Sequence, residues 1–139
     1  MSQTAPRPWH LWAVGLLSLM WNAFGGYDFV MKNVRAPSYV SQLPAEAIQF
    51  IDGLPAWMVV CWALGVWGAV LGSLLLLVRS RFAVHAFTAS LFGLAANTAY
   101  TATSDAPTGQ PAGLTIAIWA AAIALLIYAM RARGAGALR

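Results

Sequence analysis

The chain has 139 residues, of which 60% are hydrophobic and only 9% are charged, and its formal net charge is +4. A soluble domain carries about 25% charged residues, so this composition leaves too few charged groups to cover a surface in water. The basic residues are scattered singly and form no patch with interleaved aromatic residues, which argues against nucleic acid as a partner. The composition therefore indicates an integral membrane protein with one helical domain.

Four apolar segments follow one another along the chain, each bounded by charge, proline or polar clusters. They cover residues 9–31, 54–78, 82–103 and 112–130. Each can cross about 30 Å of hydrocarbon at about 1.5 Å per residue, and none alternates like a barrel strand. The links RSR and DAPTGQP are so short that consecutive helices must be neighbours. The sequence therefore predicts an all-α integral membrane protein with four transmembrane helices in an antiparallel bundle.

The longest link, between the first two segments, contains a shorter element. The stretch LPAEAIQFIDGLP mixes apolar side chains such as Ile48 and Phe50 with the charged Glu46 and Asp52. This mixture is typical of a short amphipathic helix that lies at the membrane surface. We therefore expect such a helix between the first and second transmembrane helices.

The charges predict an orientation in the membrane. With four spans, one side holds the larger set of basic residues: Arg7, Arg79, Arg81, Arg131, Arg133 and Arg139. The other side holds Lys32 and Arg35 together with Glu46, Asp52 and Asp105. Loops rich in arginine and lysine stay in the cytoplasm. We therefore expect a multi-pass protein of the bacterial inner (plasma) membrane, with both termini cytoplasmic and the amphipathic helix periplasmic.

The end of the first segment, WNAFGGYDFVMK, carries polar groups where a membrane-spanning helix is expected to be apolar. Asp28 and Lys32 are four residues apart in the favourable acid-before-base order. In an antiparallel arrangement, the end of the third segment comes level with Asp28. These residues form one candidate polar pocket that opens to the outer side: Asn22, Asp28, Lys32, Asn97 and Tyr100.

Two roles remain open for Asp28. An ionisable residue within a transmembrane segment is a candidate for function. Asp28, however, lies only one helical turn before Lys32, near the outer boundary. At that depth, the favoured role is to tie the end of the helix to the following loop.

Small residues recur in the second segment at spacings of three and four. They form a candidate helix-packing face made of Gly65, Gly68, Ala69 and Gly72. Small residues let two helices approach closely in lipid, where packing drives association. The favoured interpretation is packing within the bundle, and the alternative is a face for a second copy of the chain.

The residue inventory offers little for catalysis. The chain has four acidic residues, two histidines and one cysteine. It has no phosphate-binding loop, no nucleophile elbow and no histidine or cysteine pairs at the spacing of metal ligands. General acid–base catalysis needs positioned titratable groups, which are scarce here. We therefore expect no metal, no cofactor and no enzymatic activity.

Three stretches carry a resemblance to known proteins: WNAFGGYDFVMKNVR, LPAWMVVCWALGVWGAVLGSLLLLVRSR and AVHAFTASLFGLAANTAY. They resemble a family of small bacterial four-span membrane proteins, often labelled hypothetical proteins or, loosely, sugar transporters. The layout is also similar in topology to DoxX-like proteins. Small multidrug-resistance transporters share the size and an acid in the first helix, but their acid lies in mid-membrane, unlike Asp28. The resemblance implies the four-span fold and no particular mechanism.

These features predict a non-enzymatic accessory or interaction protein in the lipid bilayer. We expect it to form a homodimer or to be a subunit of a larger membrane complex. The alternative is a small-solute transporter that uses the polar pocket around Asp28.

Overall fold

The computed structural model describes residues 8–104 and 111–139, and every regular element in these ranges is a helix. The elements are α1 (Trp9–Val34), α2 (Pro37–Val40), α3 (Ala45–Asp52), α4 (Ala56–Leu77), α5 (Ala83–Thr103) and α6 (Ala112–Gly134). The predicted all-helical fold is confirmed for this part of the chain. The long helices α1, α4, α5 and α6 occupy the four apolar segments, and α3 forms within the expected amphipathic stretch. The sequence did not predict α2.

Two of the described helices, α4 and α6, are long and apolar enough to cross a membrane. In their most apolar stretches, only 17% of α4 and 6% of α6 is buried inside the protein. The core helix of a soluble protein would instead be mostly buried. The helices α1 and α5 are less apolar, because α1 includes Asn22 and Asp28 and α5 includes Asn97.

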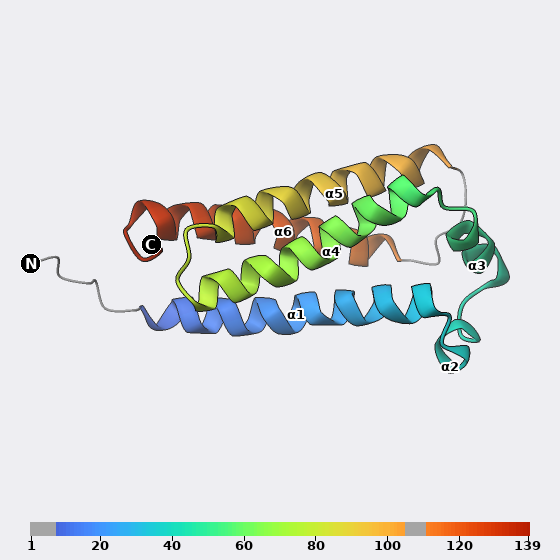
Figure 1. Ribbon diagram of the computed structural model, residues 1–139, viewed down its shortest axis with the longest axis horizontal. Helices are drawn as coiled ribbons and strands as arrows, with labels where there is room; N and C mark the ends of the chain where they lie inside the picture. The colour runs from blue at the N-terminus through green and yellow to red at the C-terminus, as the bar shows by residue number, and fades with distance from the viewer. Residues whose placement is uncertain (1–7, 105–110) are drawn as a thin grey trace, which may run out of the picture.

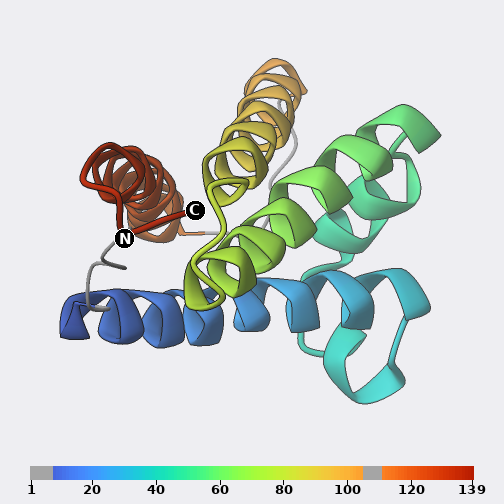
Figure 2. The same ribbon diagram turned by 60° about the vertical axis from the view of Figure 1, so that its left-hand side comes forward.

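The four long helices lie side by side in the order α1, α4, α5, α6, and each runs antiparallel to its neighbour in this row (Figures 1 and 2). The most extensive contact joins α4 to α5, followed by α1 with α4 and α5 with α6. The short helices α2 and α3 lie at one end of the row, and the C-terminus lies at the other (Figure 1). The four long helices are therefore antiparallel neighbours, arranged as an open row over most of their length.

The row closes at the end that holds the C-terminus. Leu11 of α1, Leu76 of α4, Phe87 of α5 and Ala129 of α6 belong to one buried cluster there. The ring nitrogen Nδ1 of His10 lies 2.6 Å from the hydroxyl of Tyr128, which links the start of α1 to the end of α6. All four long helices therefore contribute to a common core at this end.

The contact between α4 and α5 is close because glycines line it. A Cβ atom at Gly93 of α5 would lie 2.5 Å from the carbonyl oxygen of Cys61 and 2.6 Å from the nitrogen of Gly65. At Gly72 of α4, a Cβ atom would lie 2.7 Å from the ring of Phe87. Real Cβ atoms essentially never approach other atoms so closely, so larger residues at these two positions would push the helices apart.

The small-residue face predicted on α4 is occupied within the chain. Gly65, Gly68 and Gly72 face α5, where atoms of Ser90, Phe87 and Leu94 surround them. Ala69 lies at the edge of this face nearest α1, and its carbonyl oxygen accepts a hydrogen bond from Asn22 of α1. A second copy of the chain cannot use this face while α5 covers it, so the dimer face considered from the sequence is not available here.

Replacing Gly93 with alanine should destabilise the protein by about 1–3 kcal/mol, because the added methyl group meets backbone atoms that cannot rotate away. Detergent-induced unfolding in micelles, followed by circular dichroism, measures this change.

Gly25→Ala is the matched control, because a Cβ atom at Gly25 meets nothing within 4 Å. Alanine also favours a helix over glycine by about 1 kcal/mol, so this variant should be as stable as the native protein or more so. Equal stability of the Gly93 and Gly25 variants would contradict the close α4–α5 contact.

Candidate functional site

The polar end of α1 forms a small network with α2. Both carboxylate oxygens of Asp28 are engaged: Oδ2 lies 2.9 Å from Nζ of Lys32, and Oδ1 accepts a hydrogen bond from the hydroxyl of Tyr39. The chain turns back after Val34 because Arg35 adopts a left-handed conformation with φ 55°. This turn brings α2 alongside the last turns of α1. Asp28 thus ties the segment after the helix to the helix itself.

The network changes the acidity of Tyr39. The hydrogen bond to the Asp28 carboxylate, together with partial burial, raises the pKa of Tyr39 to about 12. A tyrosine that donates to a carboxylate would place two negative charges side by side if it lost its proton. With its pKa at about 12, Tyr39 stays protonated and keeps donating at pH values where an ordinary tyrosine, with a pKa of 10.0, loses its proton.

A second ion pair holds α3 against the same end of α1. Arg35 pairs with Asp52 at the end of α3. Beneath this pair is a hollow of about 10 Å³, lined by Lys32, Arg35, Val40, Leu43, Ile48, Ile51 and Asp52. One water molecule needs about 10–15 Å³ of such space. The hollow has room for about one water molecule and is too small for a transported solute.

Asn22 lies elsewhere and joins α1 to α4. Its side-chain nitrogen donates to the carbonyl oxygen of Ala69 at 3.2 Å and to the hydroxyl of Ser73 at 2.9 Å. Ser73 is fully buried and donates in turn to the carbonyl oxygen of Ala69 at 3.0 Å. The amide therefore has partners on the neighbouring helix, and its role here is to hold α1 against α4.

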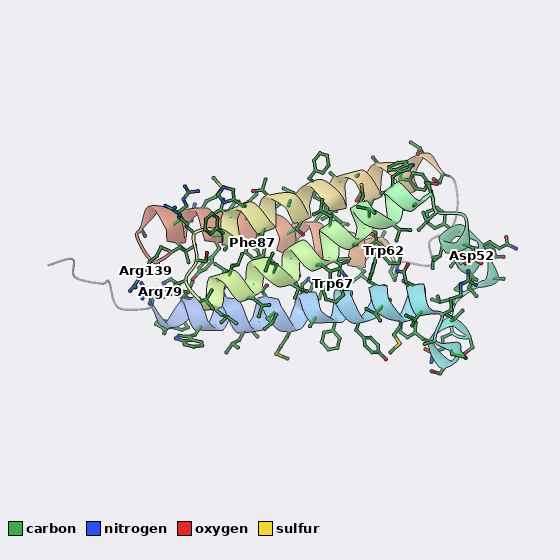
Figure 3. All side chains as sticks on the ribbon, viewed as in Figure 1. Asp52, Trp62, Trp67, Arg79, Phe87 and Arg139 are labelled. Atoms are coloured by element: carbon green, nitrogen blue, oxygen red, sulfur yellow. The ribbon has the colours of Figure 1, made fainter. Side chains whose placement is uncertain are left out.

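Aromatic rings fill the space between α1 and α4 on the side of Asp28. Phe29 meets Trp62 edge to face, with ring centroids 4.8 Å apart, and also approaches Trp67 at 6.4 Å. A Cβ atom at Gly26 would lie 3.1 Å from the Trp67 ring, so glycine gives this ring its space. Figure 3 labels both tryptophans on α4. Of the two adjacent glycines, Gly26 serves packing, whereas Gly25 faces open space.

The two candidates from α5 lie on the far side of α4. The Tyr100 ring packs against Trp57 of α4 at 5.8 Å and Phe50 of α3 at 6.1 Å. The backbone carbonyl oxygen of Asn97 accepts a hydrogen bond from Thr101 at 3.1 Å. The contact with Phe50 places Tyr100 toward the end of the row with α3, but the depth of a residue along its helix does not show which helices are neighbours.

Among the described residues, the five candidates therefore occupy three places. Asp28 and Lys32 lie with α2, Asn22 lies against α4, and Asn97 and Tyr100 lie on α5. The structure does not bring them into one pocket. The physical reason is that α4 stands between α1 and α5 in the row.

Several contacts at this end were not found from the sequence. Tyr39 was missed because α2 was not expected, although Pro37 at its first position is a common helix-start signal. The Arg35–Asp52 pair joins opposite charges at the two ends of the link, and these opposite charges are visible in the sequence. No pattern in the sequence indicates the hydrogen bond from Trp119 of α6 to Thr98 of α5, which is 3.1 Å long.

Within the described ranges, no group of three or more histidine, cysteine, aspartate or glutamate residues is placed to hold a metal ion. Comparisons with protein-family models, curated proteins and solved structures give no match. The resemblance to small four-span proteins stays a prediction. Function is therefore inferred from the residues and contacts of the chain itself.

The Tyr39–Asp28 hydrogen bond should stabilise the protein in a defined pH range. The pKa of Tyr39 is raised in the folded state, from 10.0 to about 12. Its contribution is therefore fully present below pH 10 and is lost as the pH rises through about 12. Ultraviolet absorbance of tyrosinate, compared between the native protein and Tyr39→Phe, isolates this titration.

Asp28→Asn is the matched variant, because it removes the charge and keeps the size of the side chain. We expect it to move the Tyr39 titration back toward 10.0, the ordinary value. If Tyr39 titrates at the same pH in the native protein and in Asp28→Asn, the assigned network is wrong.

Proposed function

We propose that the chain is a four-span protein of the bacterial inner membrane and acts as a non-enzymatic interaction subunit. In this proposal, the exposed face of α6 binds a transmembrane helix of another subunit. The observation that carries the proposal is that α6 leaves a face of small residues uncovered while burying very little of its own surface.

Membrane insertion of all four long helices is supported by their exposed apolar side chains. Large hydrophobic residues face outward along α1, including Leu17, which is 67% exposed, and Phe24, which is 70% exposed. Further exposed residues, such as Trp67 of α4 and Phe92 of α5, continue this surface. Monomeric soluble proteins rarely expose apolar patches beyond a few hundred Å². The polar groups of α1 have partners, since Asn22 bonds to α4 and Asp28 pairs with Lys32.

The proposed orientation is supported by the charges at the two ends of the row. The end with the C-terminus holds the described arginines Arg79, Arg81, Arg131, Arg133 and Arg139. The described acidic side chains, Asp28, Glu46 and Asp52, belong to the end with α2 and α3. Arg7 and Asp105 lie outside the described residues. The positive-inside rule then favours cytoplasmic termini and periplasmic α2 and α3.

The uncovered face of α6 has the character of a helix-packing face. Gly113, Ala117, Ala120 and Ala124 fall within a narrow arc at about 100° per residue. Among the described residues, nothing lies within 4 Å of a Cβ atom placed at Gly113, and Ala120 and Ala124 are exposed. Small residues in such a line let a second helix approach closely in lipid.

The small contact of α6 with its own chain supports the same proposal. Of the residues described in α6, Ala129 and Ala132 are buried, and both lie at its cytoplasmic end in the proposed orientation. Along the rest of its length, the main neighbour of α6 is α5, with Trp119 donating to Thr98. A helix in this position can gain much more packing from a partner helix.

The proposal is non-enzymatic because acid–base chemistry needs positioned titratable groups with available protons or lone pairs. Such groups are scarce, since the chain has four acidic residues and two histidines, and Asp28 and Asp52 form ion pairs with Lys32 and Arg35 respectively. These contacts give the two carboxylates structural roles at the end of α1.

Ala120→Phe should block the α6 face, because the large ring keeps a partner helix from approaching. Overpacking costs about 1–3 kcal/mol, so association should weaken about fivefold or more. The protein, purified in mild detergent, is analysed by its mass and by what co-purifies in stoichiometric amount. Two differently tagged copies, expressed together, distinguish a second copy from a different subunit.

Met20→Phe is the matched control, since Met20 is an exposed residue of α1 on another face of the row. It should leave association unchanged. A native protein that is strictly monomeric and free of partners would contradict the proposal, and so would equal weakening by Ala120→Phe and Met20→Phe.

A further inference from the structure

A polar hollow lies at the basic end of the protein, between the α4–α5 turn and the residues that follow α6. Its space of about 380 Å³ is open to solvent, and it is lined by Val78, Arg79, Ser80 and Arg139. Figure 3 shows Arg79 and Arg139 close together at this end and Asp52 at the opposite end. The hollow has ample room for a phosphate group and the atoms next to it.

The backbone around the hollow is held in place by the end of the chain. The N–H of Arg81 donates to the carbonyl oxygen of Arg139, and the N–H of Arg139 donates to that of Arg79, both at 2.8 Å. Nε of Arg79 donates to the carbonyl oxygen of Ala137 at 2.9 Å. Ala137 and Leu138 are buried in the core cluster. The two arginines that line the hollow are therefore brought together by the fold and not by sequence proximity.

The side-chain charge at this end favours an anion. Arg81, Arg131 and Arg133 are exposed at the same end, in addition to the two arginines of the hollow. The described acidic side chains lie at the opposite end, where Asp28 and Asp52 are paired. Guanidinium groups bind phosphate through paired hydrogen bonds as well as charge. The arginines of the hollow are therefore suited to bind phosphate oxygens.

An apolar stripe leads from the hollow along α4. Leu71, Leu74 and Val78 are exposed at three- and four-residue spacing, and Val78, which is 69% exposed, also lines the hollow. Such a stripe suits an acyl chain and offers nothing to a soluble phosphate. The combination of a basic hollow and an adjoining apolar stripe is the arrangement that a phospholipid needs.

We propose that this hollow binds the phosphate of an anionic phospholipid, whose acyl chain lies along Leu71, Leu74 and Val78. The proposal rests on the membrane placement given in the proposed function, with the hollow at the cytoplasmic headgroup level. The lipid must carry net negative charge, because a zwitterionic headgroup brings its own cation to the arginines. Each arginine near an anionic membrane surface increases the binding affinity about fivefold.

The test uses the full chain, purified in detergent and titrated with phosphatidylglycerol, phosphatidylcholine or inorganic phosphate, with binding counted by native mass spectrometry. We expect one phosphatidylglycerol per chain to bind at least tenfold more tightly than phosphatidylcholine. Arg79→Gln combined with Arg139→Gln should reduce this affinity about 25-fold, from about fivefold for each arginine. Arg79 also holds the end of the chain, so its replacement can disturb the fold as well as lipid binding. The single variant Arg139→Gln avoids this problem and should reduce the affinity about fivefold.

Arg131→Gln combined with Arg133→Gln is the matched control. It removes the same charge from exposed positions of α6 that do not line the hollow, so the loss should be much smaller. Equal losses in the two double variants would overturn the proposal, as would equal binding of the two lipids. Inorganic phosphate that binds as tightly as phosphatidylglycerol would overturn the lipid assignment. Retention in membranes after an alkaline carbonate wash separately tests the membrane placement.

Discussion

The close contact between α4 and α5 is the constraint on which the rest of the arrangement depends. It exists because Gly65, Gly68 and Gly72 of α4 meet α5, where Gly93 takes the tightest position. With α5 on one side, α4 has its other side left for α1, and Asn22 and Ser73 bond there. Since α4 thereby separates α1 from α5, polar residues at the same depth on those two helices cannot meet.

The two ends of the row are built by different forces. At the end with α2 and α3, charged groups connect the elements. Asp28 forms an ion pair with Lys32 and accepts a hydrogen bond from Tyr39, and Arg35 forms an ion pair with Asp52. At the basic end, apolar packing joins all four long helices, and the end of the chain folds back to pair with the α4–α5 turn. Between these ends, α6 packs mainly against α5. This unequal packing is what makes α6 the surface proposed for a partner and the basic end the place proposed for a lipid phosphate.

The sequence predicted the helices well because apolar length and proline or charge boundaries are local signals, as the agreement of α4 and α6 with their predicted segments shows. The glycine pattern of α4 also predicted a packing face, but it did not predict that α5 covers this face. The pocket around Asp28 could not be predicted because spacing gives the depth of Asn97 and Tyr100 and not the rotation or neighbours of their helix. Tyr39 lies in a link whose turn at Arg35 gives no strong pattern, so its bond to Asp28 emerged only from the fold.

The most direct test of the account is the position of each end of the row relative to the membrane. Single cysteines at Ser41 after α2, at Ala112 at the start of α6 and at Ala135 after α6 would be introduced into a Cys61→Ser background. Intact cells are then treated with a membrane-impermeant maleimide. The account predicts labelling of the cysteines at 41 and 112 from outside, and labelling at 135 only after the membrane is opened. Labelling at 135 in intact cells, or protection of the cysteine at 41 or 112, would contradict four spans with the basic end in the cytoplasm.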